Sequence, residues 1–317
     1  MRGLLVVNPG ATTTSPRVLD VLVHALSHEV SLLVRRTSRR GDAIEMARQA
    51  RRDGVDVVIT LGGDGTVNEA INGMLADGPG PDVPMIAAVP GGSANVFARA
   101  LGLPANPVEA TGTILSALRM GRSRLIGLGR VDSPASSGSD GARWFAANAG
   151  LGIDADIIEA MERKRSAGLL ATPTRYVTTT LTELFLRARR RPAALSLERD
   201  GLPTHTGVHL VIVQNTSPWT FLGSIPVNPC PSASFDSGLD LFAIERLDVA
   251  TLSRVASRML GRRHSGSARH GFTVWHDVDD VTVRAARPMR LQVDGEGLGE
   301  VPWARFKAVP EAIRAVA

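Results

Sequence analysis

The chain has 317 residues, of which 44% are hydrophobic and 4% aromatic, and its formal net charge is +5 at pH 7. This length is sufficient for two domains, while the single cysteine, Cys230, excludes a framework of intramolecular disulfides. No apolar run approaches the ~18 residues of a transmembrane helix, and residues 1–3 lead directly into a strand-like run, so we expect no secretory signal. A cytoplasmic enzyme fits these features, and the modest basic surplus favours phosphate groups or an anionic membrane surface as a partner.

The first 120 residues alternate between strands and helices. Apolar runs predict strands at residues 3–8, 30–35, 55–61 and 85–89, and helical spacing after each strand predicts helices at residues 16–27, 42–52, 67–75 and 94–101. Repeated βα units of this length indicate a parallel sheet with helices on both faces. In such sheets, ligands bind at the carboxyl ends of the strands.

After residue 121 the pattern changes to short extended segments, at residues 124–131, 143–148, 194–198, 209–214, 239–245, 281–284 and 289–293. Strands without intervening helices favour an antiparallel sandwich. We therefore predict an α/β domain at residues 1–122, to which a tail at 304–317 returns, and a β-sandwich domain at 123–303. Predicted helices at 174–190 and 249–260 interrupt the sandwich, and residues 134–141 are predicted to form a hairpin loop.

Three of the predicted strand ends in the first domain carry polar, glycine-rich loops: Asn8-Pro9-Gly10-Ala11-Thr12, Gly62-Gly63-Asp64-Gly65-Thr66-Val67-Asn68-Glu69 and Pro90-Gly91-Gly92-Ser93-Ala94-Asn95. Glycines let the backbone approach a bulky anion, and a helix N-terminus supplies N–H groups and positive dipole charge. Asp64 would repel a phosphate unless a metal ion or a reacting hydroxyl lies between them. Taken alone, the middle motif also fits a glycine turn with an aspartate cap, but three such loops at one sheet edge favour an anion site.

Asp294-Gly295-Glu296 is a second candidate. Residues two apart at a strand end point to the same side, so the two carboxylates could act on one substrate. On its own, the tripeptide is more typical of a polar turn between strands.

Together these segments resemble the diacylglycerol kinase catalytic family, bacterial lipid kinases related to sphingosine kinases and, more distantly, to NAD kinases. The resemblance also includes the segments at residues 90–99 and 148–155, and it extends from Leu4 to about Arg305. It implies a NAD-kinase-like α/β domain followed by a β-sandwich, with the active site in the cleft between them. It also implies an ATP- and Mg²⁺-dependent kinase that phosphorylates a lipid hydroxyl, with diacylglycerol or a related lipid as the expected acceptor.

By position, the resemblance implies roles for individual residues. Glu296 would accept the proton, with Asp294 beside it, and Asp64 would act through Mg²⁺ or the reacting hydroxyl. The residues expected at the ATP site are Asn8, Pro9, Gly10, Ala11, Thr12, Thr37, Gly62, Gly63, Asp64, Gly65, Thr66, Val67, Asn68, Gly92, Ser93 and Asn95.

The chain departs from the family pattern at three places. Val96 stands where the family commonly has Asp, so any acidic role there is lost. A basic residue that often follows the first loop is replaced by residues 13–15, Thr-Thr-Ser, and Arg17 is the nearest substitute. The family's structural Mg²⁺ turn is Asp-Asp-Gly, which here is Asp236-Ser237-Gly238. Because a hard cation prefers carboxylate oxygens, we expect weak or no binding by Ser234, Asp236, Ser237 and Leu239.

Two other classes of function stay open. One is a kinase for a soluble substrate such as NAD, although the later Gly-Ser-Thr-rich motif of NAD kinases is not evident and Asp-Gly-Glu is present, which favours a lipid. The other is a catalytically impaired regulator or binding protein, which Val96 and Ser237 suggest. We expect no nucleic-acid partner, and the sequence leaves a homo-oligomer open.

A lipid kinase needs contact with the membrane that holds its substrate. Residues 218–223, Pro-Trp-Thr-Phe-Leu-Gly, are predicted to form an exposed loop, and tryptophan favours membrane interfaces. The predicted helix at 176–186 adds apolar side chains beside the basic run at 187–191. We therefore predict peripheral docking on an anionic inner membrane face through the loop at 218–223, including Trp219 and Phe221, with packing onto the sandwich as the alternative for the helix.

Overall fold

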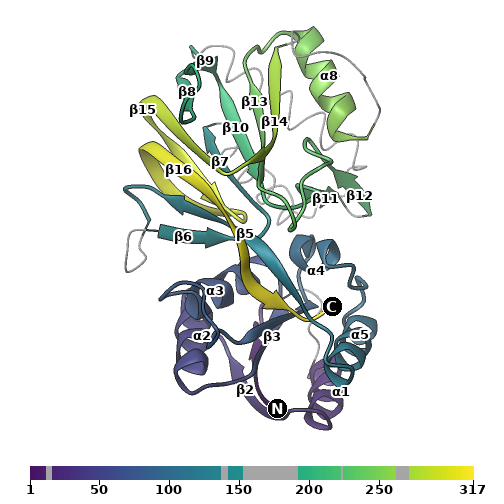
Figure 1. Ribbon diagram of the computed structural model, residues 1–317. Helices are drawn as coiled ribbons and strands as arrows, with labels where there is room; N and C mark the ends of the chain where they lie inside the picture. The colour runs from purple at the N-terminus through teal and green to yellow at the C-terminus, as the bar shows by residue number, and fades with distance from the viewer. Residues whose placement is uncertain (12–15, 137–141, 153–191, 223, 262–270) are drawn as a thin grey trace. The chain divides into compact units, whose positions relative to one another are not determined.

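The computed structural model describes residues 1–11, 16–136, 142–152, 192–222, 224–261 and 271–317. Contacts divide the chain into two compact units, which can be followed by colour in Figure 1. Unit 1 comprises Met1–Leu128 and Pro310–Ala317, and unit 2 comprises Gly129–Val309. The domain limits expected from the sequence, at residues 122 and 304, stay predictions.

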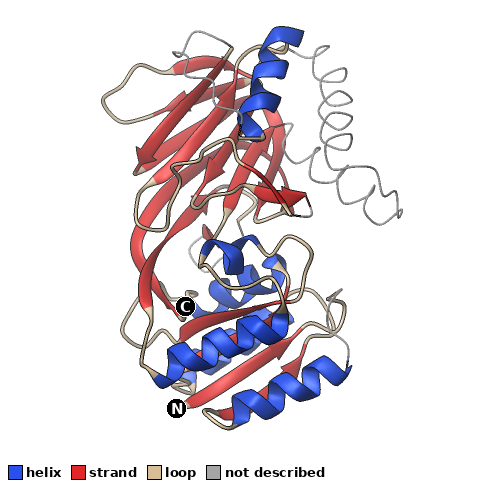
Figure 2. Ribbon diagram, turned by 90° about the vertical axis from the view of Figure 1, so that its right-hand side faces the viewer, coloured by secondary structure: helices blue, strands red, loops and turns tan. Residues whose placement is uncertain are grey.

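Unit 1 is built on a parallel sheet in which the strand order is β4-β3-β1-β2. The central strand β3 is buried at all six of its positions, as its β-branched and leucine side chains require, and it pairs in parallel with β1 and β4. Helix α2 packs on α3 and α1 on α5, and Figure 2 shows helices flanking these strands. The bounds are β1 (Arg2–Val7), α1 (Pro16–Ser27), β2 (Ser31–Arg36), α2 (Asp42–Arg52), β3 (Val57–Gly62), α3 (Asp64–Met74), β4 (Met85–Pro90), α4 (Val96–Ala100) and α5 (Pro107–Arg119).

The end of the chain completes this sheet. Strand β16 (Glu296–Ala315) pairs in parallel with β4 at Ala315 and Ile86, and the Val316 backbone N–H donates to the Ile86 carbonyl at 2.9 Å. The C-terminal residues therefore cover the edge of β4 that faces away from β3.

Unit 2 is an antiparallel β-sandwich, as the spacing of its short strands predicts, and it carries one described helix, α8 (Val249–Met259). One sheet path runs β14-β13-β10-β7-β15-β16, with β5 paired to β6 and to β16, and β8 paired to β9 and to β15. The bounds are β5 (Arg124–Asp132), β6 (Ala142–Phe145), β7 (Asn148–Gly152), β8 (Leu195–Glu198), β9 (His205–Val208), β10 (Leu210–Gln214), β11 (Thr220–Leu222), β12 (Ile225–Val227), β13 (Leu239–Ile244), β14 (Phe272–Val278) and β15 (Asp280–Val293).

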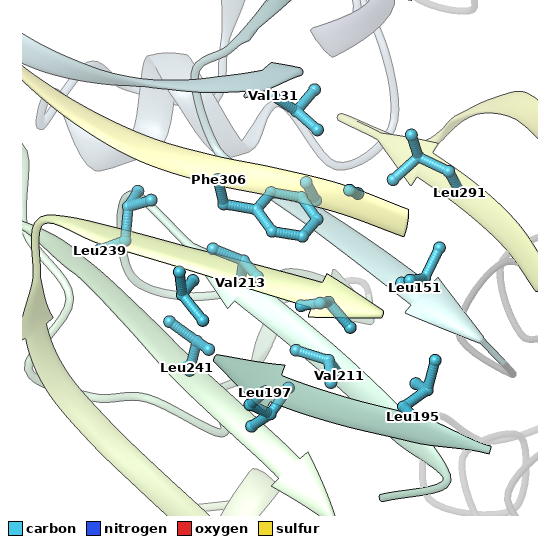
Figure 3. Close-up of a cluster of buried hydrophobic side chains, with 14 of the residues drawn as sticks. Val131, Leu151, Leu195, Leu197, Val211, Val213, Leu239, Leu241, Leu291 and Phe306 are labelled. Carbon is cyan, nitrogen blue, oxygen red and sulfur yellow. The ribbon is translucent and has the colours of Figure 1, made fainter. Parts of the chain in front are cut away.

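The main hydrophobic core of unit 2 lies between these strands. Side chains from β5, β7, β8, β10, β13, β15 and β16 meet in it, and Figure 3 shows Leu151, Val213, Leu241 and Phe306 among them. The described core holds one close aromatic pair, Phe145 with Phe306, at a ring separation of 6.3 Å. Strand β8 alternates between buried and partly exposed positions, whereas β7, β10 and β13 are buried at every position, so these three strands are covered on both faces.

A second cluster of unit 2 overturns the prediction for Trp219. The Trp219 side chain is only 5% exposed and packs with Val255 and Met259 of α8. Its backbone N–H donates to the Val227 carbonyl at 3.0 Å, because β11 turns back onto β12. The prediction that this tryptophan lies in an exposed, membrane-docking loop is therefore wrong, and its indole is part of the core.

Some expectations fall outside the described residues. These are Thr12 of the first loop, Gly223, the predicted helix at residues 174–190 and the basic run at 187–191. Across the part of the chain that the structure describes, no helix combines the length and apolarity needed to cross a bilayer.

Candidate active site

The two glycine-rich turns of unit 1 lie against each other, backbone to backbone. The Gly91 N–H donates to the Gly62 carbonyl at 2.7 Å. A Cβ atom added at Gly91 would lie 2.9 Å from the Cα of Gly62, and one added at Gly92 would lie 2.6 Å from the Cα of Gly63. Only glycine permits this approach, so the predicted motifs that follow β3 and β4 form one surface at the carboxyl edge of the sheet.

The loop after β1 joins this surface from the other side. From β1 the chain passes to β2 on one flank, whereas β3 lies on the opposite flank, so the strand order reverses between β1 and β3. Open α/β sheets bind ligands at such a reversal. Here Asn8 bridges it: its Nδ2 donates to Thr66 Oγ1 at 3.2 Å, and its Oδ1 accepts from the Gly10 N–H at 2.9 Å.

Helix α3 begins at this point with its N-terminus at the turn. Gly63 is the N-cap residue and carries no side chain that could occupy the first N–H groups of the helix. A helix N-terminus of this kind favours an anion through its N–H groups and its dipole. The side chains of Thr66, Val67 and Asn68 are buried, and their part in nucleotide binding stays a prediction.

Asp64 has a structural partner within unit 1. Its Oδ1 accepts from the Phe97 backbone N–H at 3.0 Å. Phe97 lies in the first turn of α4, so Asp64 caps that short helix from α3. The cap explains how α4 begins at Val96 although no acidic side chain stands there. Asp64 therefore fixes the second glycine-rich turn relative to the first.

Asn95 closes the turn after β4. It adopts a left-handed backbone conformation with φ of 49°, its Oδ1 accepts from the Gly92 N–H at 2.9 Å, and its Nδ2 donates to the Gly92 carbonyl at 2.7 Å. Asparagine tolerates this conformation better than most residues. Ser93, between these two residues, is left exposed at the surface of the turn.

The loop after β2 is fixed by two carboxylates that the sequence interpretation did not single out for this role. The Thr37 N–H donates to the Val7 carbonyl at 2.9 Å, which places Thr37 beside the β1 loop. Asp42 accepts from the backbone N–H groups of Ser38 and Arg39, and these bonds hold the pKa of Asp42 below its ordinary value. Glu69 of α3 accepts from the Gly41 N–H at 3.0 Å and thereby ties this loop to the glycine turn.

The Asp294-Gly295-Glu296 segment forms the turn between β15 and β16 in unit 2. The Asp294 carboxylate accepts three backbone N–H groups at 2.8–2.9 Å, from Ala146, Ala147 and Asn148. Asp294 also has a positive φ of 46°, which these bonds stabilise. Glu296 has a different partner: Nη2 of Arg143 lies 2.6 Å from its Oε2. The two acids therefore have different surroundings, and Asp294 is anchored to backbone.

The turn at Asp236, where the sequence predicts weak or no metal binding, offers few oxygen donors for a cation. Ser237 donates both its N–H and its hydroxyl to the Ser234 carbonyl, each at 3.2 Å, so this carbonyl is engaged within the turn. Asp236 is the only carboxylate among the four predicted ligands. Among the described residues, no group of three or more His, Cys, Asp or Glu side chains is arranged to hold a metal ion. The donor set thus lacks the carboxylates that Mg²⁺ prefers.

Comparison with known proteins assigns the chain to a family. Residues 2–131 match the model for the diacylglycerol kinase catalytic domain, and residues 147–317 match that for the YegS C-terminal NAD kinase beta sandwich-like domain. The chain belongs to the diacylglycerol kinase catalytic-domain family. The family resemblance expected from the motifs is therefore confirmed.

Two named relatives and one solved structure are similar to this chain over most of its length. The diacylglycerol kinase of Bacillus subtilis (strain 168) is 27% identical over 268 residues, which cover 84% of this chain and 79% of that protein. A protein named "Probable lipid kinase YegS-like" from Stenotrophomonas maltophilia (strain K279a) is 28% identical, covering 99% and 95%. The crystal structure of a diacylglycerol kinase from Bacillus anthracis str. Sterne superposes with a TM-score of 0.72 at 21% identity, covering 99% and 96%, and shows a common fold. Membership of this family supports a phosphotransferase.

Proposed function

We propose that this protein is an ATP-dependent lipid kinase, which transfers the γ-phosphoryl group of ATP to the hydroxyl of diacylglycerol or a related lipid. The observation that carries the proposal is the meeting of the Asn8 loop and the two glycine turns where the strand order reverses, with Asp64 between the turns. Phosphoryl transfer depends mainly on phosphate positioning and charge neutralisation, and this surface offers both. The names of the relatives from Bacillus and Stenotrophomonas support a lipid acceptor.

In the proposed reaction, the backbone N–H groups of the turns and of the α3 N-terminus bind the phosphates. The Asp64 carboxylate is the oxygen donor in the turn that would hold Mg²⁺, and the ion would supply neutralisation of phosphate charge. Glu296 takes the proton of the acceptor hydroxyl as that oxygen forms a bond to the γ-phosphorus. The bond from this phosphorus to the β-phosphate oxygen breaks, and ADP leaves.

Asp294 has a supporting part in this proposal. Because its carboxylate accepts three backbone N–H groups, it orients the turn that presents Glu296. The nucleotide requirement places the proposed reaction in the cytoplasm, at the inner face of the membrane that holds the lipid.

The test is transfer of labelled phosphate from Mg²⁺-ATP by the purified protein, with diacylglycerol in mixed micelles and NAD offered in parallel. We expect label in phosphatidic acid, and a loss of ~10² to 10⁴-fold in turnover for Glu296→Gln with ATP affinity little changed. Transfer to NAD and not to lipid would assign the protein to soluble-substrate kinases. Binding of ATP without transfer to either acceptor would favour the impaired, regulatory alternative suggested by Val96 and Ser237.

A further inference from the structure

A mostly buried arginine holds the carboxylate of Glu296. Nη2 of Arg143 lies 2.6 Å from Oε2 of Glu296, and the two side chains are 11% and 17% exposed. This distance is at the short end for a hydrogen bond between two charged groups, which is stronger and more directional than one between neutral groups. The pair joins β6 to the first residue of β16.

Strand geometry places both side chains beside the core of unit 2. Arg143 lies two residues before Phe145 in β6, and Phe145 belongs to the main hydrophobic cluster. Glu296 lies directly opposite Val293 of β15, and Val293 belongs to the same cluster. Residues two apart in a strand share a face, as do residues directly opposite on neighbouring strands, so the ion pair lies on the inward faces of β6 and β16, at the margin of an apolar core.

A gain in folding stability does not by itself explain why Arg143 and Glu296 form an ion pair beside the core. The cost of removing two charges from water can exceed the attraction between them, so a hydrophobic pair of similar volume is often no less stable. What an arginine adds is orientation, since its planar guanidinium bonds a carboxylate in fixed geometry. Fixing Oε2 also fixes the direction of the other carboxylate oxygen of Glu296.

We propose that Arg143 is a positioning residue, which aims the Glu296 carboxylate at the hydroxyl that it deprotonates. The proposal rests on the proposed function, in which Glu296 is the proton acceptor. Asp294 holds the turn through its backbone contacts, and Arg143 holds the side chain that the turn presents. A base misplaced by about 1 Å can lose ~10²-fold in rate, so this restraint affects turnover more than nucleotide binding.

The experiment compares Arg143→Met, Arg143→Lys, Glu296→Gln and the Arg143→Met/Glu296→Gln double variant in the full chain. For Arg143→Met we expect kcat to fall ~10 to 100-fold with the KM for ATP within about twofold. Arg143→Lys keeps the charge without the planar fork and should recover part of kcat. In the Glu296→Gln background, removal of Arg143 should cause no further loss of kcat, because the group that it positions is already absent.

Arg284→Met is the matched control, because Arg284 pairs with Glu198 at 2.8 Å in the same unit but is 58% exposed. It should leave kcat and KM unchanged. If losses from Arg143→Met and Glu296→Gln multiply in the double variant, Arg143 acts independently of Glu296 and the inference is wrong. Unchanged kcat in Arg143→Met overturns it as well, while a kcat unchanged in Glu296→Gln overturns the assigned base itself.

Discussion

The carboxylate of Asp64 has a charge and a capping hydrogen bond, and two substitutions separate their effects. Asp64→Asn removes the charge but keeps an oxygen that can accept from the Phe97 N–H, which now lies 3.0 Å away. Asp64→Ala removes both and leaves that N–H without this acceptor beside a side chain that is 1% exposed. The asparagine variant therefore tests the chemistry of the turn, and the alanine variant tests its structure as well.

The loss of the hydrogen bond and the loss of the charge have different expected effects on Tm and on turnover. Losing a hydrogen bond to a charged group costs ~1.5–3 kcal/mol, which in a chain of this size lowers Tm by roughly 2–5 °C for Asp64→Ala. Asp64→Asn should stay within about 2 °C of the unaltered protein. Its turnover should fall by at least ~10²-fold, the effect of removing one preorganised electrostatic group.

The assay combines thermal unfolding with labelled-phosphate transfer. Asp77→Asn is the control, since it removes a like charge from an exposed position after the end of α3. Turnover near that of the unaltered protein in folded Asp64→Asn would refute the electrostatic role. A Tm in Asp64→Ala equal to that in Asp64→Asn would refute the cap.

Three further predictions concern pH, the core and metal binding. Hydrogen bonds from Ser38 and Arg39 lower the folded-state pKa of Asp42 below the ordinary 3.8, so its stabilising effect is complete above that value and is lost as pH falls through the folded-state pKa. In urea unfolding from about pH 6 to about pH 2, the gap between Asp42→Asn and the unaltered protein should shrink at low pH, and a constant gap would contradict this. Trp219→Ala should reduce the free energy of unfolding by ~3–5 kcal/mol, and an unchanged value would show that the indole is not in the core. Ser237→Asp should add a Mg²⁺-binding event in calorimetry, whereas tight binding by the unaltered protein would contradict the poor fit of this turn.

The first unit was largely predictable because its signals are local. The helix expected at residues 42–52 has the same bounds in the structure, whereas the helix expected at 67–75 begins three residues earlier, at Asp64, and ends at Met74. The spacing of apolar residues and the position of glycines determine helices, strands and turns over a few residues, so the sequence pattern is sufficient to predict these elements. Helix α5 was missed, although Asn106 before Pro107 is an N-cap signal that could have revealed it.

Features that depend on distant residues were not predictable. Arg143 and Glu296 are 153 positions apart, and the available signal was an arginine at an inward position of an apolar strand. The exposed loop expected around Trp219 proved to be β11, because β12 and α8 supply the surfaces that bury the indole. Strand β15 was predicted as two strands, at residues 281–284 and 289–293, yet it continues through Pro288 with a register shift between Arg284 and Met289.

The return of β16 to the edge of β4 has a consequence for synthesis on the ribosome. The partner of Ile86 is Ala315, which is translated after the whole of unit 2. At ~5–20 residues per second, the nascent sheet waits roughly 10–40 s with one side of β4 unpaired. Exposed strand edges are sites of intermolecular pairing. If residues 1–128 are expressed alone, the outer edge of β4 has no partner strand from the chain. Fusing residues 310–317 to that fragment through a short linker would supply the missing strand.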